Sequence, residues 1–268
     1  MRFTIIPCLL LLSSLGFTGC KKDTTITSNE LVPMTVEFDN IVGGQNLFLN
    51  TVTYKNKMGE DYTISRLQYF ISNISLVKTD GTEYIVPADS SYFLIREAEP
   101  ETRFARFRVP VGDYQSLKFI VGVDSLRSTM DVSRRTGVLD PTGGMEDGMY
   151  WSWNSGYIFF KMEGDSPSAP ADPSGNHKFR FHIGGFGGYS APGINNIRNV
   201  NLDLRASGLV QARTGRKSNI HLMADIAKVM DGSTTVRLAE NASVMFGDYS
   251  SKIADNCSQV FFHDHTEN

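Results

Sequence analysis

The histidines are the residues of this sequence best suited to holding a metal ion. The 268-residue chain has five, and all of them follow position 176. His263 and His265 form a His-Asp-His element close to the end of the sequence. In an extended chain residues i and i+2 point to the same face, so both imidazoles could reach one ion, and imidazole suits copper, zinc and nickel. The alternative is a solvated tail, and the spacing alone favours neither.

The other three histidines have simpler interpretations. His182 lies in the middle of an alternating segment and faces away from its apolar neighbours, which is typical of a surface or hydrogen-bonded side chain but also leaves it available to a metal. His221 faces away from its apolar neighbours in the same manner, with Met223 on the same side, and a structural role is favoured more strongly there. His177 lies in a loop and is expected to face solvent.

A second reactive group lies between positions 143 and 157. Trp151 and Trp153 are the only tryptophans of the sequence, and in an extended chain they would share one face. Met145 and Met149 add soft thioethers. One interpretation is aromatic core packing. The other is an oxidisable, electron-rich cluster beside a metal site.

Three acidic residues in the same region offer a different ligand chemistry. Asp140, Glu146 and Asp147 lie near a glycine turn, and carboxylate oxygens are the ligands that calcium prefers. Calcium is therefore a candidate cofactor here. The spacing is not that of an EF-hand, and a solvated acidic loop is the favoured interpretation.

Motifs of the common enzyme classes do not occur in the sequence. It has no phosphate-binding loop, dinucleotide fingerprint, nucleophile elbow, paired-cysteine motif or HExxH. We therefore expect no catalytic residues and no enzyme activity. The net charge of −3 also argues against nucleic acid, because phosphate binding needs a concentrated excess of Lys and Arg.

Residues 1–19 have the features of an export signal. Arg2 is their one charged residue, and the apolar run at 5–12 is too short to span a bilayer. The segment ends with small residues before Cys20, which is typical of a bacterial lipoprotein and predicts a lipid on Cys20. Ordinary secretion with cleavage nearby is the alternative. The polar residues 20–33 then predict a tether, and the protein is expected in the cell envelope, at the outer membrane facing the periplasm or the surface.

The cysteine positions agree with this interpretation. Cys8 would leave with the signal and Cys20 would carry the lipid, so Cys257 would remain alone and no intrachain disulfide could form. A lone cysteine is more often a small buried hydrophobe than a metal ligand.

The hydrophobic pattern predicts that residues 34–268 form one all-β domain, an antiparallel β-sandwich with a few short helices. A one-residue slip near Ser72 predicts a bulge, Asp80-Gly81 predicts a hairpin, and helical spacing predicts a short helix over 249–258. The glycine-rich loop 184–192 is either simple turn chemistry or a lip beside a site. Strands are expected near 35–38, 67–76, 84–86, 104–109, 117–123, 157–162, 179–183, 200–204 and 220–224.

Six segments become specific when they are taken together and in order. They are Arg66–Ile74, Val109–Tyr114, Gly122–Ser125, Gly137–Pro141, Met149–Gly164 and Phe181–Gly185. In this order they resemble the MbnP-like copper-binding proteins, a family named for the periplasmic partner protein of methanobactin operons and common as lipoproteins in Bacteroidetes. The resemblance covers about residues 35–262.

The resemblance implies an exported, mostly β protein that binds copper. In that family a partner di-haem enzyme of the cytochrome c peroxidase type oxidises a tryptophan to kynurenine, and kynurenine and histidines then ligate copper. The matching positions here are Trp151, Trp153 and His182, while His263 and His265 are candidates to complete the site. The alternative function is a non-catalytic recognition sandwich of the surface or periplasm that binds a peptide or glycan.

Overall fold

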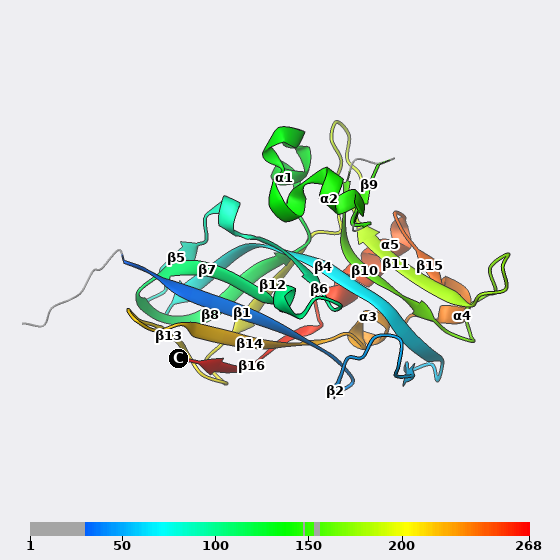
Figure 1. Ribbon diagram of the computed structural model, residues 1–268, viewed down its shortest axis with the longest axis horizontal. Helices are drawn as coiled ribbons and strands as arrows, with labels where there is room; N and C mark the ends of the chain where they lie inside the picture. The colour runs from blue at the N-terminus through cyan, green and yellow to red at the C-terminus, as the bar shows by residue number, and fades with distance from the viewer. Residues whose placement is uncertain (1–29, 147, 153–155) are drawn as a thin grey trace, which may run out of the picture.

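Two β-sheets packed face to face form the body of the protein (Figure 1). This computed structural model describes residues 30–146, 148–152 and 156–268. The predicted signal peptide and Cys20 lie outside the described residues. No helix in the described ranges is long and apolar enough to cross a membrane.

The smaller sheet has five strands in the order β16-β14-β1-β2, with β7 also paired to β1. Strand β1 therefore lies at its centre, parallel to β14 and antiparallel to β7. The strands are β1 (Leu31–Val42), β2 (Gln45–Asn46), β7 (Phe104–Pro110), β14 (Ser218–Asp225) and β16 (Phe261–Glu267).

The larger sheet has eleven strands around the order β12-β8-β4-β10-β11-β15. Strand β13 pairs with β8, strands β3, β5 and β6 pair with β4, and β9 pairs with β10. The strands are β3 (Tyr54–Lys55), β4 (Asp61–Lys78), β5 (Glu83–Ile85), β6 (Tyr92–Arg96), β8 (Gly112–Val121), β9 (Tyr150–Trp151), β10 (Gly156–Asp165), β11 (Lys178–Gly184), β12 (Arg198–Asp203), β13 (Val210–Ala212) and β15 (Ser243–Val244).

Helices are short, as the sequence predicts. The α-helices are α1 (Ser125–Thr129), α2 (Pro141–Glu146), α3 (Lys228–Asp231), α4 (Leu238–Asn241) and α5 (Asp248–Cys257), and the 3-10 turns are η1 (Ala88–Ser90), η2 (Pro100–Arg103), η3 (Val132–Arg134) and η4 (Gly137–Leu139). The all-β sandwich is thus confirmed. Its pairing is antiparallel except where β1 meets β14 and β11 meets β15.

The core between the sheets is built from alternating side chains and a group of aromatic rings. Strand β1 buries every second residue, as expected for a strand with one face on a core. Phe38 of this strand makes edge-to-face contacts with Phe119, Tyr69 and Phe261, at centroid distances of 5.8, 6.3 and 5.9 Å. Such pairs add about 0.5–1.5 kcal/mol each beyond their buried area. The rings come from four strands, so they hold both sheets together.

Several local features follow from the sequence pattern. Asn73 has a positive φ of 53°, and the pairing of β4 with β8 shifts between Ser72 and Ser75, which confirms the bulge. Gly81 has φ 87° in the hairpin between β4 and β5. Helix α5 confirms the predicted helix, and Cys257 at its end is buried, which raises the pKa of its thiol.

The domain begins three residues earlier than the sequence pattern predicts. Residues 31–33, assigned to the tether, are the first residues of β1, and Val32 is buried opposite Val109 of β7. Pro33 is tolerated because pairing of β1 with β14 begins only at Met34, so the amide that proline lacks is not needed on that side.

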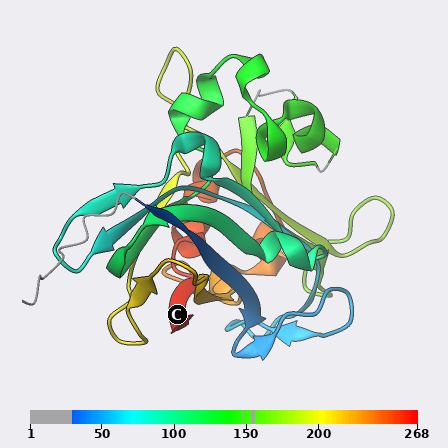
Figure 2. The ribbon, with the colours of Figure 1, turned by 60° about the vertical axis from the view of Figure 1, so that its left-hand side comes forward.

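A second, smaller hydrophobic cluster covers the outer face of the large sheet at one end. It explains why residues 157–162 are buried on both faces, as predicted. Helices α1 and α2 and strand β9 cover this end, on the opposite side of the molecule from the end of β16 (Figures 1 and 2). Its buried members are Phe70, Leu94, Val123, Leu139, Met149, Trp151, Tyr157, Ile158, Phe159 and Phe186.

Gly164 of β10 is the position where an added methyl group should be most costly. A Cβ there would lie 1.8 Å from the carbonyl oxygen of Thr63 and 2.7 Å from the ring of Phe179. Because backbone cannot yield easily, we expect Gly164→Ala to lower the free energy of unfolding by about 3 kcal/mol or more, measured by urea denaturation. Gly143→Ala is the control, since a Cβ there meets nothing within 4 Å, and equal stability of both variants would contradict the packing described.

Candidate functional site

Trp151 and His182 lie on the outer face of the large sheet. Trp151 of β9 pairs with Gly156 of β10 and is 6% exposed. Gly184 of β11 lies beneath its indole, because a Cβ on Gly184 would be 2.7 Å from Cζ3 of Trp151. His182 is two residues from Gly184 in the same strand and therefore shares this face. The structure thus brings one predicted tryptophan and one predicted histidine to the same surface, while Trp153 lies outside the described residues.

His182 is partly buried and hydrogen-bonded. Its Nε2 lies 2.6 Å from Oε1 of Glu163, a residue of the neighbouring strand β10. This hydrogen bond lowers the pKa of the Glu163 carboxyl, against the opposing effect of burial. The contact holds the imidazole through Nε2, and Nδ1 is the ring nitrogen outside this contact.

A small cavity of about 90 Å³ lies between Phe246 and the glycine-rich loop that follows β11. Phe246 lines it and contacts Trp151 edge-on at a centroid distance of 6.1 Å. The other side is the glycine-rich loop 184–192, in which Phe186 and Tyr189 pack edge to face at 5.0 Å. The loop makes turns at Gly185, Gly187 and Gly188, all with positive φ. It is therefore a turn-rich connection that also lines a cavity, while its role as a lip beside a site stays a prediction.

The histidines of β16 lie on the other sheet, where a β-bulge changes their directions. Leu222 of β14 pairs with His263 and His221 pairs with His265, so Asp264 is an extra residue in β16. A bulge breaks the strict alternation of a strand. His263 and His265 consequently do not form the expected pair. The Nε2 of His263 instead lies 2.9 Å from the hydroxyl of Thr266, and burial lowers the pKa of His263.

His265 groups with Asp264 and with His221 of the adjacent strand. One ligand atom from each of these residues lies within 4.8 Å of the others. Oδ2 of Asp264 is 2.8 Å from Nδ1 of His265 and 3.2 Å from Nδ1 of His221. The two rings lie 4.7 Å apart between centroids. Within the described ranges, these residues are the one group of three or more His, Cys, Asp or Glu side chains with such spacing.

Further carboxylates surround this group. Nε2 of His221 faces Glu37 and Asp39 of β1, at 4.0 and 3.8 Å, because β1 and β14 run parallel with Glu37 opposite His221. Nε2 of His265 lies 3.6 Å from Glu267. Hydrogen bonding to Asp264, with the nearby carboxylates, raises the pKa of the His265 imidazole. The arrangement is one of two imidazoles enclosed by acidic side chains.

The MbnP family profile matches residues 32–246. This chain belongs to the MbnP family. A solved structure, MbnP from Methylosinus trichosporium, is similar with a TM-score of 0.54 over 82% of each chain at 15% identity, a level that shows a shared fold only. A comparison with curated proteins found no match.

The segment matched by the MbnP profile contains the Trp151 group but only part of the His221 group. Trp151, Trp153 and His182 lie inside the matched segment, whereas Asp264 and His265 lie beyond its end. Their partner His221 is within it, although the sequence favoured a structural role for this residue. The signal that could have identified His221 is its outward position on β14, but its proximity to Asp264 depends on the bulge.

Asp140 and His177, two further residues with side chains that can bind a metal, lie in loops outside the helices and strands. Asp140 accepts a hydrogen bond from the backbone N–H of Thr142 at 2.9 Å, as a turn residue does. Asp147 lies outside the described residues, so the calcium prediction stays a prediction. His177 is exposed, as expected, and its Nδ1 contacts the carbonyl oxygen of Ala169 at 2.5 Å.

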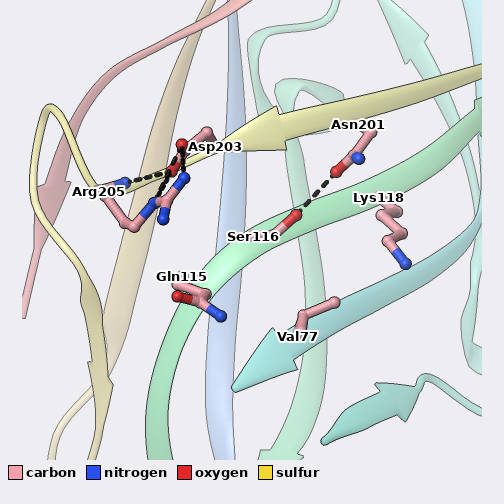
Figure 3. A pocket seen from close by; sticks show the side chains of 7 residues that line it. All are labelled: Val77, Gln115, Ser116, Lys118, Asn201, Asp203 and Arg205. Carbon is pink, nitrogen blue, oxygen red and sulfur yellow. Dashed lines mark hydrogen bonds and ion pairs between the residues drawn. The ribbon is translucent and has the colours of Figure 1, made fainter. Parts of the chain in front are cut away.

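A shallow hollow of about 390 Å³ on the large sheet offers no comparable set of ligands (Figure 3). Its charged side chains are paired: Arg205 contacts Asp203 at 2.6 Å, and Lys118 contacts Glu83 at 3.1 Å. Ser116 donates a hydrogen bond to Asn201 at 2.7 Å. We therefore assign this hollow no part in the site.

Gly184 allows us to test the position of the tryptophan. Its Cβ would also lie 2.4 Å from the carbonyl oxygen of Tyr157, so Gly184→Ala should push the indole of Trp151 away from β11. We expect a loss of about 1–3 kcal/mol in the free energy of unfolding and a red shift of tryptophan fluorescence as the ring becomes wetter.

Gly193→Ala, in the adjoining loop, is the matched control because the nearest atoms to its Cβ would lie 3.6 Å away, an ordinary contact distance. If Gly184→Ala left both stability and emission unchanged, Trp151 would not lie over this glycine.

Proposed function

We propose that this MbnP family member is an exported, lipid-anchored protein that binds copper in the cell envelope and has no enzymatic turnover of its own. The observation that carries this proposal is the position of Trp151, which lies over Gly184 on the face of β11 that also bears His182. All three residues fall within the matched segment.

The donor set fits copper when one residue is modified. His182 offers an imidazole, and Met149 offers a thioether from the hydrophobic cluster that contains Trp151. Indole itself is a poor ligand, but oxidation of Trp151 or Trp153 to kynurenine would add an aromatic amine. Copper(I) accepts such soft and borderline ligands. A di-haem partner enzyme of the cytochrome c peroxidase type would carry out this oxidation.

The position of the chain's entry into the fold suits an anchor at Cys20. Strand β1 begins at the end of the sandwich away from α1, α2 and β9 (Figures 1 and 2). A tether from the outer membrane to Leu31 would therefore leave the Trp151 end directed away from the membrane. We propose that the partner enzyme reaches Trp151 from this side.

Copper content and tryptophan chemistry can be measured together. We expect the chain purified from its native host to carry about one copper ion at this site, with a changed mass for the peptide that contains Trp151 and Trp153. His182→Ala should reduce the copper bound here at least about 10-fold, because a ligand is lost. Metal analysis and peptide mass spectrometry check both expectations.

His177→Ala is the control, since this exposed histidine lies in a loop apart from Trp151. Copper binding that is absent from the native protein, or unaffected by His182→Ala, would overturn the proposal. The aromatic, glycine-rich loops would then be examined for peptide or glycan binding, the alternative function.

The anchor has its own test. We expect Cys20→Ser to move the protein from the membrane fraction to the soluble fraction, because the residue that carries the lipid is lost. Without its acyl chains the protein loses this anchor, so most of it should leave the membrane fraction. Fractionation followed by immunoblotting measures it, and a variant that remains with the membrane would refute lipidation at Cys20.

A further inference from the structure

We infer a second metal site at the bulge of β16, in which His221, Asp264 and His265 bind a divalent transition-metal ion such as zinc(II) or copper(II). This site goes beyond the proposed function. It lies on the five-stranded sheet rather than the large one, and two of its three ligands lie beyond the segment that the MbnP profile matches.

The spacing of the three side chains suits a single ion. Oδ2 of Asp264 already lies 2.8 and 3.2 Å from the Nδ1 atoms of His265 and His221. Around an ion with bonds of about 2.0–2.2 Å, ligand atoms lie roughly 3–4 Å apart. The three ligand atoms already lie within 4.8 Å of one another. Small rotations of the side chains would therefore be enough for all three to coordinate one ion.

The far nitrogen of each imidazole faces a carboxylate. Nε2 of His221 lies 3.8 Å from Asp39 and 4.0 Å from Glu37, and Nε2 of His265 lies 3.6 Å from Glu267. Metal-binding histidines usually direct their second ring N–H to a carboxylate, which fixes the tautomer and strengthens the ligand. Both histidines therefore have the outer partners that a metal site requires, in addition to the shared carboxylate of Asp264.

The outer partners are themselves held in place across three strands. The side-chain amide of Asn219 in β14 donates to Glu37 of β1 at 2.9 Å and to Glu267 of β16 at 3.3 Å. Arg103 approaches Asp39 at 4.0 Å and also pairs with Glu97 at 2.6 Å. Four carboxylates thus face two histidines and one nearby arginine. The local charge favours a cation.

The ligand types and exposure indicate the class of ion. Nitrogen and oxygen donors without a thiolate favour borderline divalent ions over copper(I). The side chain of His221 is 13% exposed, while those of Asp264 and His265 are 41% and 47% exposed. The site is therefore open on one side, where water can supply a fourth ligand, as in three-ligand zinc sites.

Metal titration of the full chain, produced without a histidine tag and without the di-haem partner, tests this inference. We expect equilibrium dialysis to give about one zinc(II) or copper(II) per chain. His265→Ala and Asp264→Asn should each weaken binding at least about 10- to 100-fold. Electron paramagnetic resonance of the copper(II) form should show two coordinated nitrogens, and one after His265→Ala.

Three controls separate this site from the proposed copper site. His177→Ala, His182→Ala and Trp151→Phe should leave the affinity for zinc(II) unchanged, and circular dichroism should show that each variant is folded. Asp39→Asn tests the outer partners and should weaken zinc(II) binding about 10-fold. The inference is overturned if the unmodified chain binds no divalent ion, if Asp264→Asn and His265→Ala bind as tightly as the parent, or if His182→Ala abolishes the binding.

Discussion

The contact among Phe38, Tyr69, Phe119 and Phe261 is the interaction on which the rest of this structure depends. These rings join the two sheets, and Tyr69 also donates a hydrogen bond to Asn40 at 2.9 Å in the buried interior. Because the inner faces are occupied by packing, chemistry is left to the outer faces. Phe261 also fixes the start of β16, three residues before the bulge that turns Asp264 toward His221.

The two outer faces have different chemical characters. On the large sheet, Trp151 lies in an apolar cluster with Met149, on the face that also bears the imidazole of His182. On the small sheet, two imidazoles lie among carboxylates and are open to water. Soft ligands in apolar surroundings favour copper(I), and nitrogen and oxygen ligands favour divalent ions. The proposed copper site and the inferred divalent-ion site thus lie in two different chemical environments of one sandwich.

The sequence predicts local structure better than it predicts which residues meet. Alternation and turn residues suffice for the bulge near Ser72, the hairpin at Gly81 and helix α5, because each depends on neighbours in the chain. The first residues of β1, 31–33, follow a polar segment and show no alternation of their own, so the sequence places them in the tether. The sequence predicts a structural role for His221 and not a place in a cluster of ligands. Its partners lie on β1 and β16, and the pairing of these strands and the bulge in β16 cannot be predicted from residues near His221 in the chain. The six ordered segments of the sequence predicted the MbnP family, whereas the amino-acid composition gave no indication of it.

The parallel pairing of β1 with β14 has a consequence for the order of folding. Glu37 and Asn219, which are hydrogen-bonded across this pair, are 182 residues apart in the chain. During synthesis β1 therefore has no β14 to pair with until most of the polypeptide exists, and closing so long a loop is entropically costly. Folds dominated by such distant pairings mature slowly, in milliseconds to seconds. The central strand of the small sheet is thus among the first segments made and among the last to be enclosed.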